Sequence, residues 1–116
     1  MPQPVTLNQN RDFLRLYKRG RSLVSPILVT YCAKNRRGAT RIGITATKKG
    51  GCAVRRNRAK RVIRAAFRGL GEELTPGYDY IFVARGRTPG CKSQDVQKVM
   101  ARHVRSLTAQ GGGGKG

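Results

Sequence analysis

Four side chains recur at helical spacing along one stretch of the sequence, and they are the residues best suited to chemistry: Asn57, Arg61, Arg64 and Arg68. On an α-helix this spacing places them in one stripe roughly 16 Å long. Neighbouring like charges destabilise an isolated helix by about a few tenths of a kcal/mol per pair, and residues 55–68 contain no acid that would offset the repulsion. Guanidinium groups in a row suit bidentate contacts to phosphates. The alternative is a charged face that only meets solvent.

The overall charge also indicates a polyanionic partner. Lysine and arginine number 25 against 5 acids, which gives a net charge of +20. Such an excess is not needed for folding, and binding to phosphates would depend steeply on salt. A membrane surface is disfavoured, because the apolar side of the basic helix is rich in Ala and Val and no stretch approaches the about 20 apolar residues of a span. The first ten residues lack the apolar core of a signal peptide, so we expect a cytoplasmic protein.

The sequence is poor in groups that could perform hydrolysis. His103 is the only histidine, and it lies on the apolar side of a predicted helix, which favours a packed structural role. The acids are scattered, with no pair suited to holding two metal ions: Asp12, Glu72, Glu73, Asp79 and Asp95. The cysteines are odd in number and widely spaced, so we expect no metal site and interpret them as buried or half-buried residues: Cys32, Cys52 and Cys91. We therefore predict no catalytic group on this chain.

Periodicity and turn residues predict the elements that position the stripe. We expect helices over residues 10–19, 53–70 and 93–107. Alternating or β-branched runs predict strands over 25–34, 41–47 and 78–85, and residues 1–9 are expected to be extended without regular structure. In the long helix, an apolar sector faces the core opposite the stripe: Ala59, Val62, Ile63, Ala66, Phe67 and Leu70.

This order predicts one domain over residues 1–110, followed by a disordered Gly-rich tail over 111–116. The helix between the second and third strands suggests a crossover, so those two strands should be parallel. The fold class is therefore α+β, a two-layer sandwich of a small mixed sheet with helices mainly on one face, in the order α-β-β(-β)-α-β-α.

Four segments together resemble one known family. The run Arg56–Arg64 (RNRAKRVIR) is similar to the "RNR" signature of bacterial ribonuclease P proteins, and Arg41–Lys49 is similar to the strand that leads into it. The pattern Phe13-x-x-x-Tyr17-x-x-Gly20 and the late strand YDYIFVAR also fit that family. The resemblance extends from about residue 7 to residue 107, and it implies a left-handed crossover and a fold shared with a ribosomal protein domain.

The resemblance also implies two RNA-facing surfaces. The signature helix and its entry loop would contact a catalytic RNA; adding Arg55 and, from the stripe, Arg68 gives Arg55, Arg56, Asn57, Arg58, Lys60, Arg61, Arg64 and Arg68. The alternative role for Asn57 is helix initiation or local hydrogen bonding. A cleft between the first helix and the sheet would hold the single-stranded 5′ leader of precursor tRNA, through Phe13, Tyr17, Tyr31, Thr45, Thr47, Lys48 and Lys49. Core packing for the aromatics and β-propensity for the threonines are the alternatives.

The implied activity is removal of the 5′ leader by Mg²⁺ bound to the partner RNA, with no metal held tightly by the protein. The expected partners are the catalytic RNA and precursor tRNA, with no membrane and no obligate protein partner. Two other functions stay open from the residues alone. One is a structural RNA binder similar to a basic α+β ribosomal protein, and the other is a protein-only nuclease that uses His103 or the acids.

Overall fold

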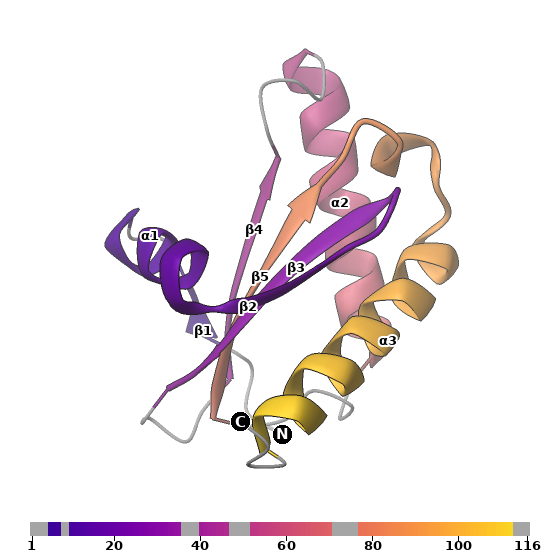
Figure 1. The fold of residues 1–116 in the computed structure, drawn as a ribbon. Coiled ribbons are helices and arrows are strands. Elements are labelled where there is room, and N and C mark those ends of the chain that lie inside the picture. The colour runs from indigo at the N-terminus through magenta and orange to yellow at the C-terminus, as the bar shows by residue number, and fades with distance from the viewer. Residues whose placement is uncertain (1–4, 8–9, 36–39, 47–51, 71–76, 113–116) are drawn as a thin grey trace.

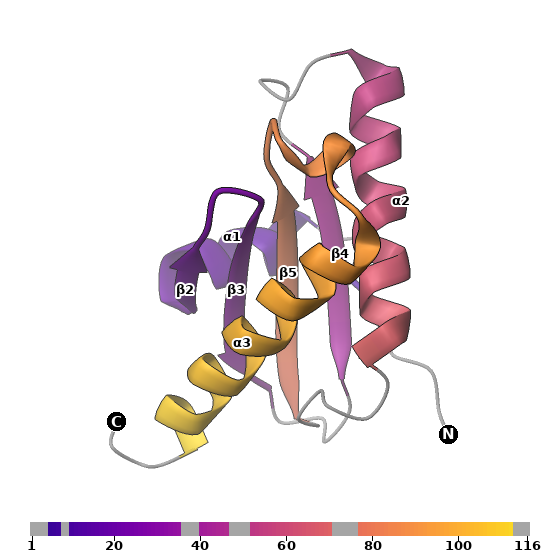
Figure 2. The ribbon, with the colours of Figure 1, turned by 90° about the vertical axis from the view of Figure 1, so that its right-hand side faces the viewer.

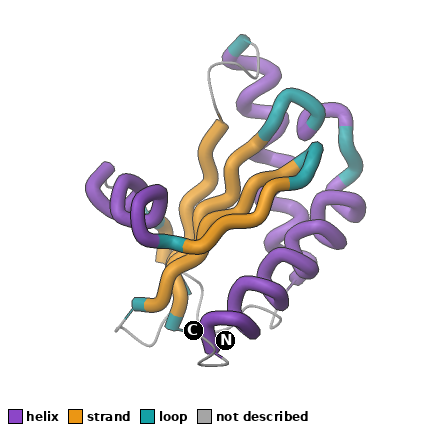
Figure 3. Tube along the Cα trace, viewed as in Figure 1, coloured by secondary structure: helices purple, strands orange, loops and turns teal. Residues whose placement is uncertain are grey.

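The computed structural model describes residues 5–7, 10–35, 40–46, 52–70 and 77–112. In chain order the elements are β1 (Val5–Thr6), α1 (Asn10–Arg19), β2 (Arg21–Val24), β3 (Leu28–Lys34), β4 (Arg41–Ala46), α2 (Ala53–Leu70), β5 (Tyr78–Ala84), the short 3-10 helix η3 (Thr88–Gly90) and α3 (Ser93–Gly112). The strands form one five-stranded sheet in the order β1-β4-β5-β3-β2. Helices α2 and α3 cover one face of this sheet, and α1 lies on the other (Figures 1 and 3).

The sheet is mixed, as the order of elements predicts. Strand β5 lies at its centre, parallel to β4 and antiparallel to β3. Helix α2 joins the two parallel strands. When the sheet is viewed from the side of α2 and α3, with β4 pointing up, the chain passes to β5 on the left of β4, which makes the crossover left-handed (Figure 2). The α+β class and the left-handed crossover are thus confirmed, against the general preference for right-handed connections.

The strands differ from the sequence-based expectation in their boundaries and in their number. The strand expected over residues 25–34 begins at Leu28, because Ser25 closes a tight turn: its backbone N–H donates to the Leu28 carbonyl at 2.8 Å, and its hydroxyl accepts from the Leu28 N–H at 3.0 Å. The preceding residues form the edge strand β2 instead. Val5 and Thr6 form a short strand beside β4, where irregular structure was expected.

The last helix extends past its expected end near residue 107. It continues to Gly112 and so includes the first two residues of the predicted disordered tail. Residues 113–116 lie outside the described part of the chain. Helix α1 and helix α2 have the bounds expected from the sequence.

The main core lies between the sheet and the pair α2 and α3. The side chains of α2 that were expected to face the core are buried or half-buried there, and they pack with Val96, Met100 and Val104 of α3. From the sheet, Tyr80 and Phe82 of β5 contribute large, fully buried rings that stack with centroids 6.1 Å apart. This packing holds the outer face of α2 away from the sheet.

His103 is part of this core, as expected for a structural histidine. Its side chain is only 5% exposed, and its Nδ1 lies 2.8 Å from the buried hydroxyl of Thr30. The bond ties α3 to β3. Burial, with a smaller effect of the positive charge of Arg102, lowers the pKa of His103 below its usual value.

This lowered pKa predicts that stability falls in mild acid. The unfolded chain binds a proton on His103 below a pH of about 6.5, whereas the folded chain takes up this proton only at a lower pH. The stability that comes from the neutral, buried His103 is therefore complete above a pH of about 6.5, and it is lost as the pH falls towards the pKa of the folded state. We expect His103→Gln, which keeps a partner for Thr30, to flatten the loss of denaturant stability between about pH 7.5 and 5. Equal losses in variant and parent would show that other groups control this pH range.

No helix in the described ranges is long and apolar enough to cross a membrane.

Candidate nucleic-acid interface

The face of the sheet that carries α1 is built from three cross-strand rows. Strand register places three residues in each row, one from each of β3, β5 and β4. The rows are Ala33–Asp79–Arg41, Tyr31–Ile81–Gly43 and Val29–Val83–Thr45. Because successive side chains alternate across a strand, all nine positions share this face.

Helix α1 covers only part of this face. Leu16 is fully buried against Ile81, with Phe13 and Tyr31 packed beside them. The Phe13 ring lies so close to Gly43 that a Cβ at position 43 would come within 2.6 Å of it. A glycine inside a strand often marks such a close approach, and here it seats the helix over the middle row.

The third row is left uncovered by α1. Val29, Val83 and Thr45 are each half-buried, although Val83 lies on the central strand. Arg15 bonds to Asp79 of the first row, and Tyr17 lies on the opposite side of α1, so helical spacing directs Tyr17 towards the third row. Its surface is 41% exposed, and its ring meets Tyr31 edge-on at a centroid distance of 4.8 Å. Burial, with a smaller effect of Tyr31, raises the pKa of Tyr17, so the hydroxyl stays neutral and can donate a hydrogen bond. The arrangement offers ring edges and an apolar floor to a flat, unpaired base.

The structure thus brings together four of the residues predicted for the leader cleft. Phe13, Tyr17, Tyr31 and Thr45 lie on one face, and Phe13 is the one most committed to core packing. Thr47, Lys48 and Lys49, the other three, fall outside the described residues. Val29 and Val83 complete the floor but were not predicted, because valines in a strand are ordinarily assigned to the core.

One acid on this face is enclosed by donors. Asp79 is completely buried on β5, and its Oδ1 accepts from Arg41 Nε at 2.8 Å and from Asn35 Nδ2 at 2.7 Å. Its Oδ2 accepts from Arg41 Nη2 at 2.7 Å and from Arg15 Nη2 of α1 at 2.5 Å. Burial alone would raise the pKa of Asp79, but the hydrogen bonds from Arg41, Asn35 and Arg15 outweigh it and lower the pKa.

A second acid joins this network, although the acids are scattered in the sequence. Asp12 Oδ1 lies 3.8 Å from Arg41 Nη2 and 4.0 Å from Arg15 Nη2, so the two arginines link the two aspartates. Periodicity gives no sign of this cluster, since its members lie far apart in sequence. The available signal was the charged residue inside the apolar strand YDYIFVA, because a buried charge requires partners.

The basic face of α2 lies on the other side of the molecule from α1. The stripe residues Asn57, Arg61, Arg64 and Arg68 are all exposed, and Arg58 and Arg55 are exposed as well. Arg56 and Lys60 are half-buried at the flanks. In the described part of the chain no ion pair involves the basic side chains of α2, because every ion pair there joins Arg15 or Arg41 to Asp12 or Asp79.

Among the basic residues of α2, Arg55 also makes a contact within the protein. It donates to the Gly86 carbonyl at 3.2 Å, so this arginine supports the loop after β5.

Cys52 is exposed just before α2. This corrects the expectation that all three cysteines are buried or half-buried, which holds for Cys32 and Cys91. Hydrogen bonds from the backbone N–H groups of Arg55 and Val54 lower the pKa of the Cys52 thiol.

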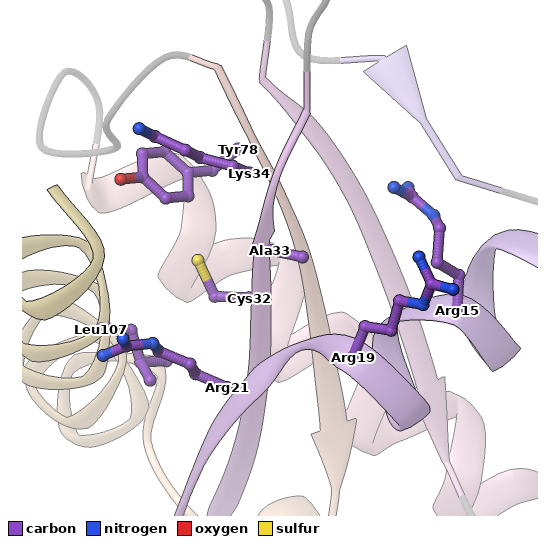
Figure 4. Close-up of a pocket in the computed structure, with 8 residues that line it drawn as sticks. All are labelled: Arg15, Arg19, Arg21, Cys32, Ala33, Lys34, Tyr78 and Leu107. Carbon is purple, nitrogen blue, oxygen red and sulfur yellow. The ribbon is translucent and has the colours of Figure 1, made fainter. Parts of the chain in front are cut away.

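A pocket of about 380 Å³ lies around the end of β3, and Arg15 and Ala33 of the α1 face are among the residues that line it. Figure 4 shows Arg15 and Arg19 on the α1 side of β3, with Cys32, Tyr78 and Leu107 on the side of α3. Burial, with a smaller effect of Asp79, raises the pKa of Cys32 to about 12, so its thiol is not a ready nucleophile. None of the residues predicted for RNA contact lines this pocket.

Within the described residues, no group of three or more His, Cys, Asp or Glu side chains is placed to hold a metal ion. The two acids that do approach each other, Asp12 and Asp79, are occupied by arginines. What the two surfaces offer is binding: an aromatic, partly apolar platform on one face of the sheet and a one-signed basic helix on the other.

The sequence matches the family described as Ribonuclease P over residues 1–108. Among curated relatives, it is 37% identical over 100 residues to the ribonuclease P protein component of Clostridioides difficile (strain 630). This alignment covers 85% of this chain and 88% of the relative. It is 31% identical over 101 residues to that of Alkaliphilus oremlandii, with coverage of 87% and 89%.

Solved structures give the same result. The RNase P protein of Staphylococcus aureus superposes with a TM-score of 0.75 at 30% identity, covering 89% of this chain and 94% of that one. The RNase P protein of Thermotoga maritima superposes with a TM-score of 0.77 at 28% identity, covering 88% and 96%.

Proposed function

The chain belongs to the ribonuclease P protein family, and on that premise we propose that it binds two RNAs at once. The outer face of α2 holds the catalytic RNA, and the open row beside Tyr17 and Tyr31 holds the single-stranded 5′ leader of precursor tRNA. The separation of the two surfaces carries this proposal: α2 covers one face of the sheet and α1 lies on the other (Figure 1), where Val29, Val83 and Thr45 are only half-buried. A single strand and a folded RNA can therefore be bound without competing.

The α2 surface recognises RNA through phosphates. Its exposed arginines lie on one helix face, roughly 16 Å long, where planar guanidinium groups match phosphate oxygens in pairs. Asn57 provides an amide in the same stripe that can bond a phosphate or a base edge. Lys48 and Lys49, which precede α2 in the sequence, are assigned to the leader instead, where they neutralise its phosphates.

The open row recognises a strand without reading its sequence closely. Every base has a flat face, so stacking on Tyr17 and Tyr31 tolerates many leaders. Val29 and Val83 offer apolar contact, and Thr45 offers a hydroxyl at the edge of the row. Such tolerance is what a subunit serving many precursor tRNAs requires.

Catalysis belongs to the RNA in this proposal. Mg²⁺ bound by the partner RNA cleaves the precursor and leaves the mature 5′ end, while the protein raises substrate affinity and supports the active RNA conformation. The protein needs no membrane and no further protein partner, and it works in the cytoplasm. The only histidine is committed to Thr30 inside the core, which speaks against a protein-only nuclease built on His103.

Replacing Tyr31 with alanine tests the leader surface. We expect Tyr31→Ala to weaken binding of leader-bearing precursor tRNA to the reconstituted complex by about 5- to 150-fold, the range of one lost base stack. Affinity for mature tRNA should change less than about twofold. Equilibrium binding of both tRNAs at one salt concentration measures the difference.

Tyr31→Phe is the matched control. It keeps the ring and removes only the hydroxyl, so leader affinity should stay close to that of the parent. If Tyr31→Ala weakens both tRNAs equally, the ring serves the small core under α1 and the leader lies elsewhere.

A further inference from the structure

We infer that Arg15 is a positioning residue for leader recognition: its bond to buried Asp79 sets the rotation of α1 and so holds the Tyr17 ring beside the open row. The inference rests on the proposed leader function of that row. Neither Arg15 nor Asp79 touches the open row itself, so their effect passes through α1.

The apolar contacts of α1 do not fix its rotation by themselves. Leu16 is the only residue of α1 that is fully buried, and hydrophobic contact has no preferred direction. Viewed down the helix, Phe13 and Tyr17 lie to one side of Leu16, and Asp12 and Arg15 lie to the other. The apolar contacts of Leu16 with Ile81 and of Phe13 with Gly43 therefore hold one side of the helix, and the side of Asp12 and Arg15 is held only by polar contacts.

The charged contact supplies the missing direction. Arg15 Nη2 donates to Asp79 Oδ2 at 2.5 Å, and Asp79 cannot move towards solvent because Arg41 and Asn35 hold its other positions. Charge-assisted hydrogen bonds are short and directional. The side of α1 opposite Tyr17 is thereby attached to the central strand.

Rotation of α1 would change the leader surface directly. Tyr17 meets Tyr31 edge-on at 4.8 Å, and Phe13 is in close contact with Gly43. Turning the helix would separate the two tyrosine rings and move Phe13 off the sheet. The base platform would then lose its order while the α2 surface stayed unchanged.

The network of Arg15, Arg41, Asp12 and Asp79 orients α1 without adding net charge to the proposed leader-binding face. Arg15 and Arg41 carry two positive charges, Asp12 and Asp79 carry two negative charges, and the sum is zero. An acid on an RNA-binding face would otherwise repel phosphates. The role of Asp79 in orienting α1 explains why an acid lies on this face.

Arg19 provides a matched control on the same helix. It is one turn beyond Arg15, it is exposed, and it belongs to none of the ion pairs described above. Arg15→Gln and Arg19→Gln remove the same charge from α1, but only the first removes the bond to Asp79. A general electrostatic effect would therefore appear equally in both variants.

The experiment measures binding of leader-bearing precursor tRNA and mature tRNA to the complex with the catalytic RNA. We expect Arg15→Gln to reduce the preference for the precursor about five- to tenfold, and Arg15→Lys, which keeps a charged donor, to recover most of it. Arg19→Gln should weaken both tRNAs by the same small factor. Hydrogen exchange on the free protein should show faster exchange of the α1 amides in Arg15→Gln and unchanged α2 amides.

Each other result has a definite meaning. If the parent shows no preference for the precursor, the proposed leader function itself fails. If the parent shows it and Arg15→Gln retains it in full, the positioning role alone is wrong. If Arg15→Gln is unfolded at the assay temperature, both measurements are repeated at a lower temperature where the variant is folded: a reduced preference with faster α1 exchange supports the inference, and an unchanged preference overturns it.

Discussion

Replacing both Arg61 and Arg64 with glutamine is expected to weaken binding to the catalytic RNA by about 10- to 100-fold, as each lost arginine removes at least one phosphate contact. Both side chains are exposed on the stripe of α2, and no acid in the described part of the chain pairs with them. The salt dependence should fall as well. The slope of log affinity against log salt should drop by roughly 1.4 to 1.8, from about 0.7 to 0.9 per contact.

A double variant on α3 is the control for net charge. Lys98 and Arg102 are exposed on the outer face of that helix, so Lys98→Gln with Arg102→Gln removes two charges from a face without a proposed RNA contact. We expect at most a few-fold loss and a nearly unchanged slope. Equal effects of the two double variants would show that total charge, and not the α2 face, binds the RNA.

Asp79→Ala is expected to lower the free energy of unfolding by about 3 kcal/mol, at the lower end of the range for breaking a buried ion pair. The substitution leaves Arg41, whose side chain is only 11% exposed, without its main partner. The loss of Asp79 costs Arg15 less stabilisation, because this side chain can reach water. Asp12, 3.8 Å from Arg41, partly neutralises the charge of Arg41 that Asp79 leaves behind. The melting temperature should fall by on the order of 10 °C.

Asp95→Ala is the comparison for this prediction. Asp95 is an exposed acid in the first turn of α3, so its loss should cost no more than about 1 kcal/mol. The lowered pKa of Asp79 adds a pH signature: its contribution is complete above a pH of about 4 and is lost as the pH falls through the folded pKa. A small effect of Asp79→Ala at neutral pH would mean that the arginines are well solvated without the acid.

The elements that could be predicted from sequence are those with long periodic patterns. Helix α2 has its apolar sector repeated over 18 residues, and its bounds agree with the expectation. Strand β2 was missed because Arg21–Val24 is a short edge strand with only two apolar residues, and it shows neither alternation nor a buried run. Its existence depends on pairing with β3 across the turn at Ser25.

The α2 stripe could be predicted for the same reason, since helical spacing alone fixes which side chains share a face. The α1 side of the sheet could be predicted only in part. The aromatic pair came from the family resemblance, whereas the Asp79 network joins residues 38 to 64 positions apart, and no local pattern records such contacts. Gly43 and the charged Asp79 within apolar strands were the local signs that something approaches that face closely.

The exposure of the third row depends on how much of the sheet α1 covers, and this follows from tertiary packing, not from local sequence. Val29 and Val83 would be assigned to the core from their residue type, yet both remain half-exposed because α1 covers only the middle row and the row of Asp79. The fold decides which apolar residues become a binding floor.

The most direct test of the account is reconstitution at low Mg²⁺ with a bacterial ribonuclease P RNA and precursor tRNA. We predict that adding this protein increases cleavage at the mature 5′ end and tightens binding of precursor over mature tRNA, while the protein freed of RNA cleaves nothing. No gain in cleavage or in substrate affinity would contradict the central claim and favour a purely structural RNA binder. Cleavage by the RNA-free protein, abolished by changing His103 or the acids, would contradict it in favour of a protein nuclease.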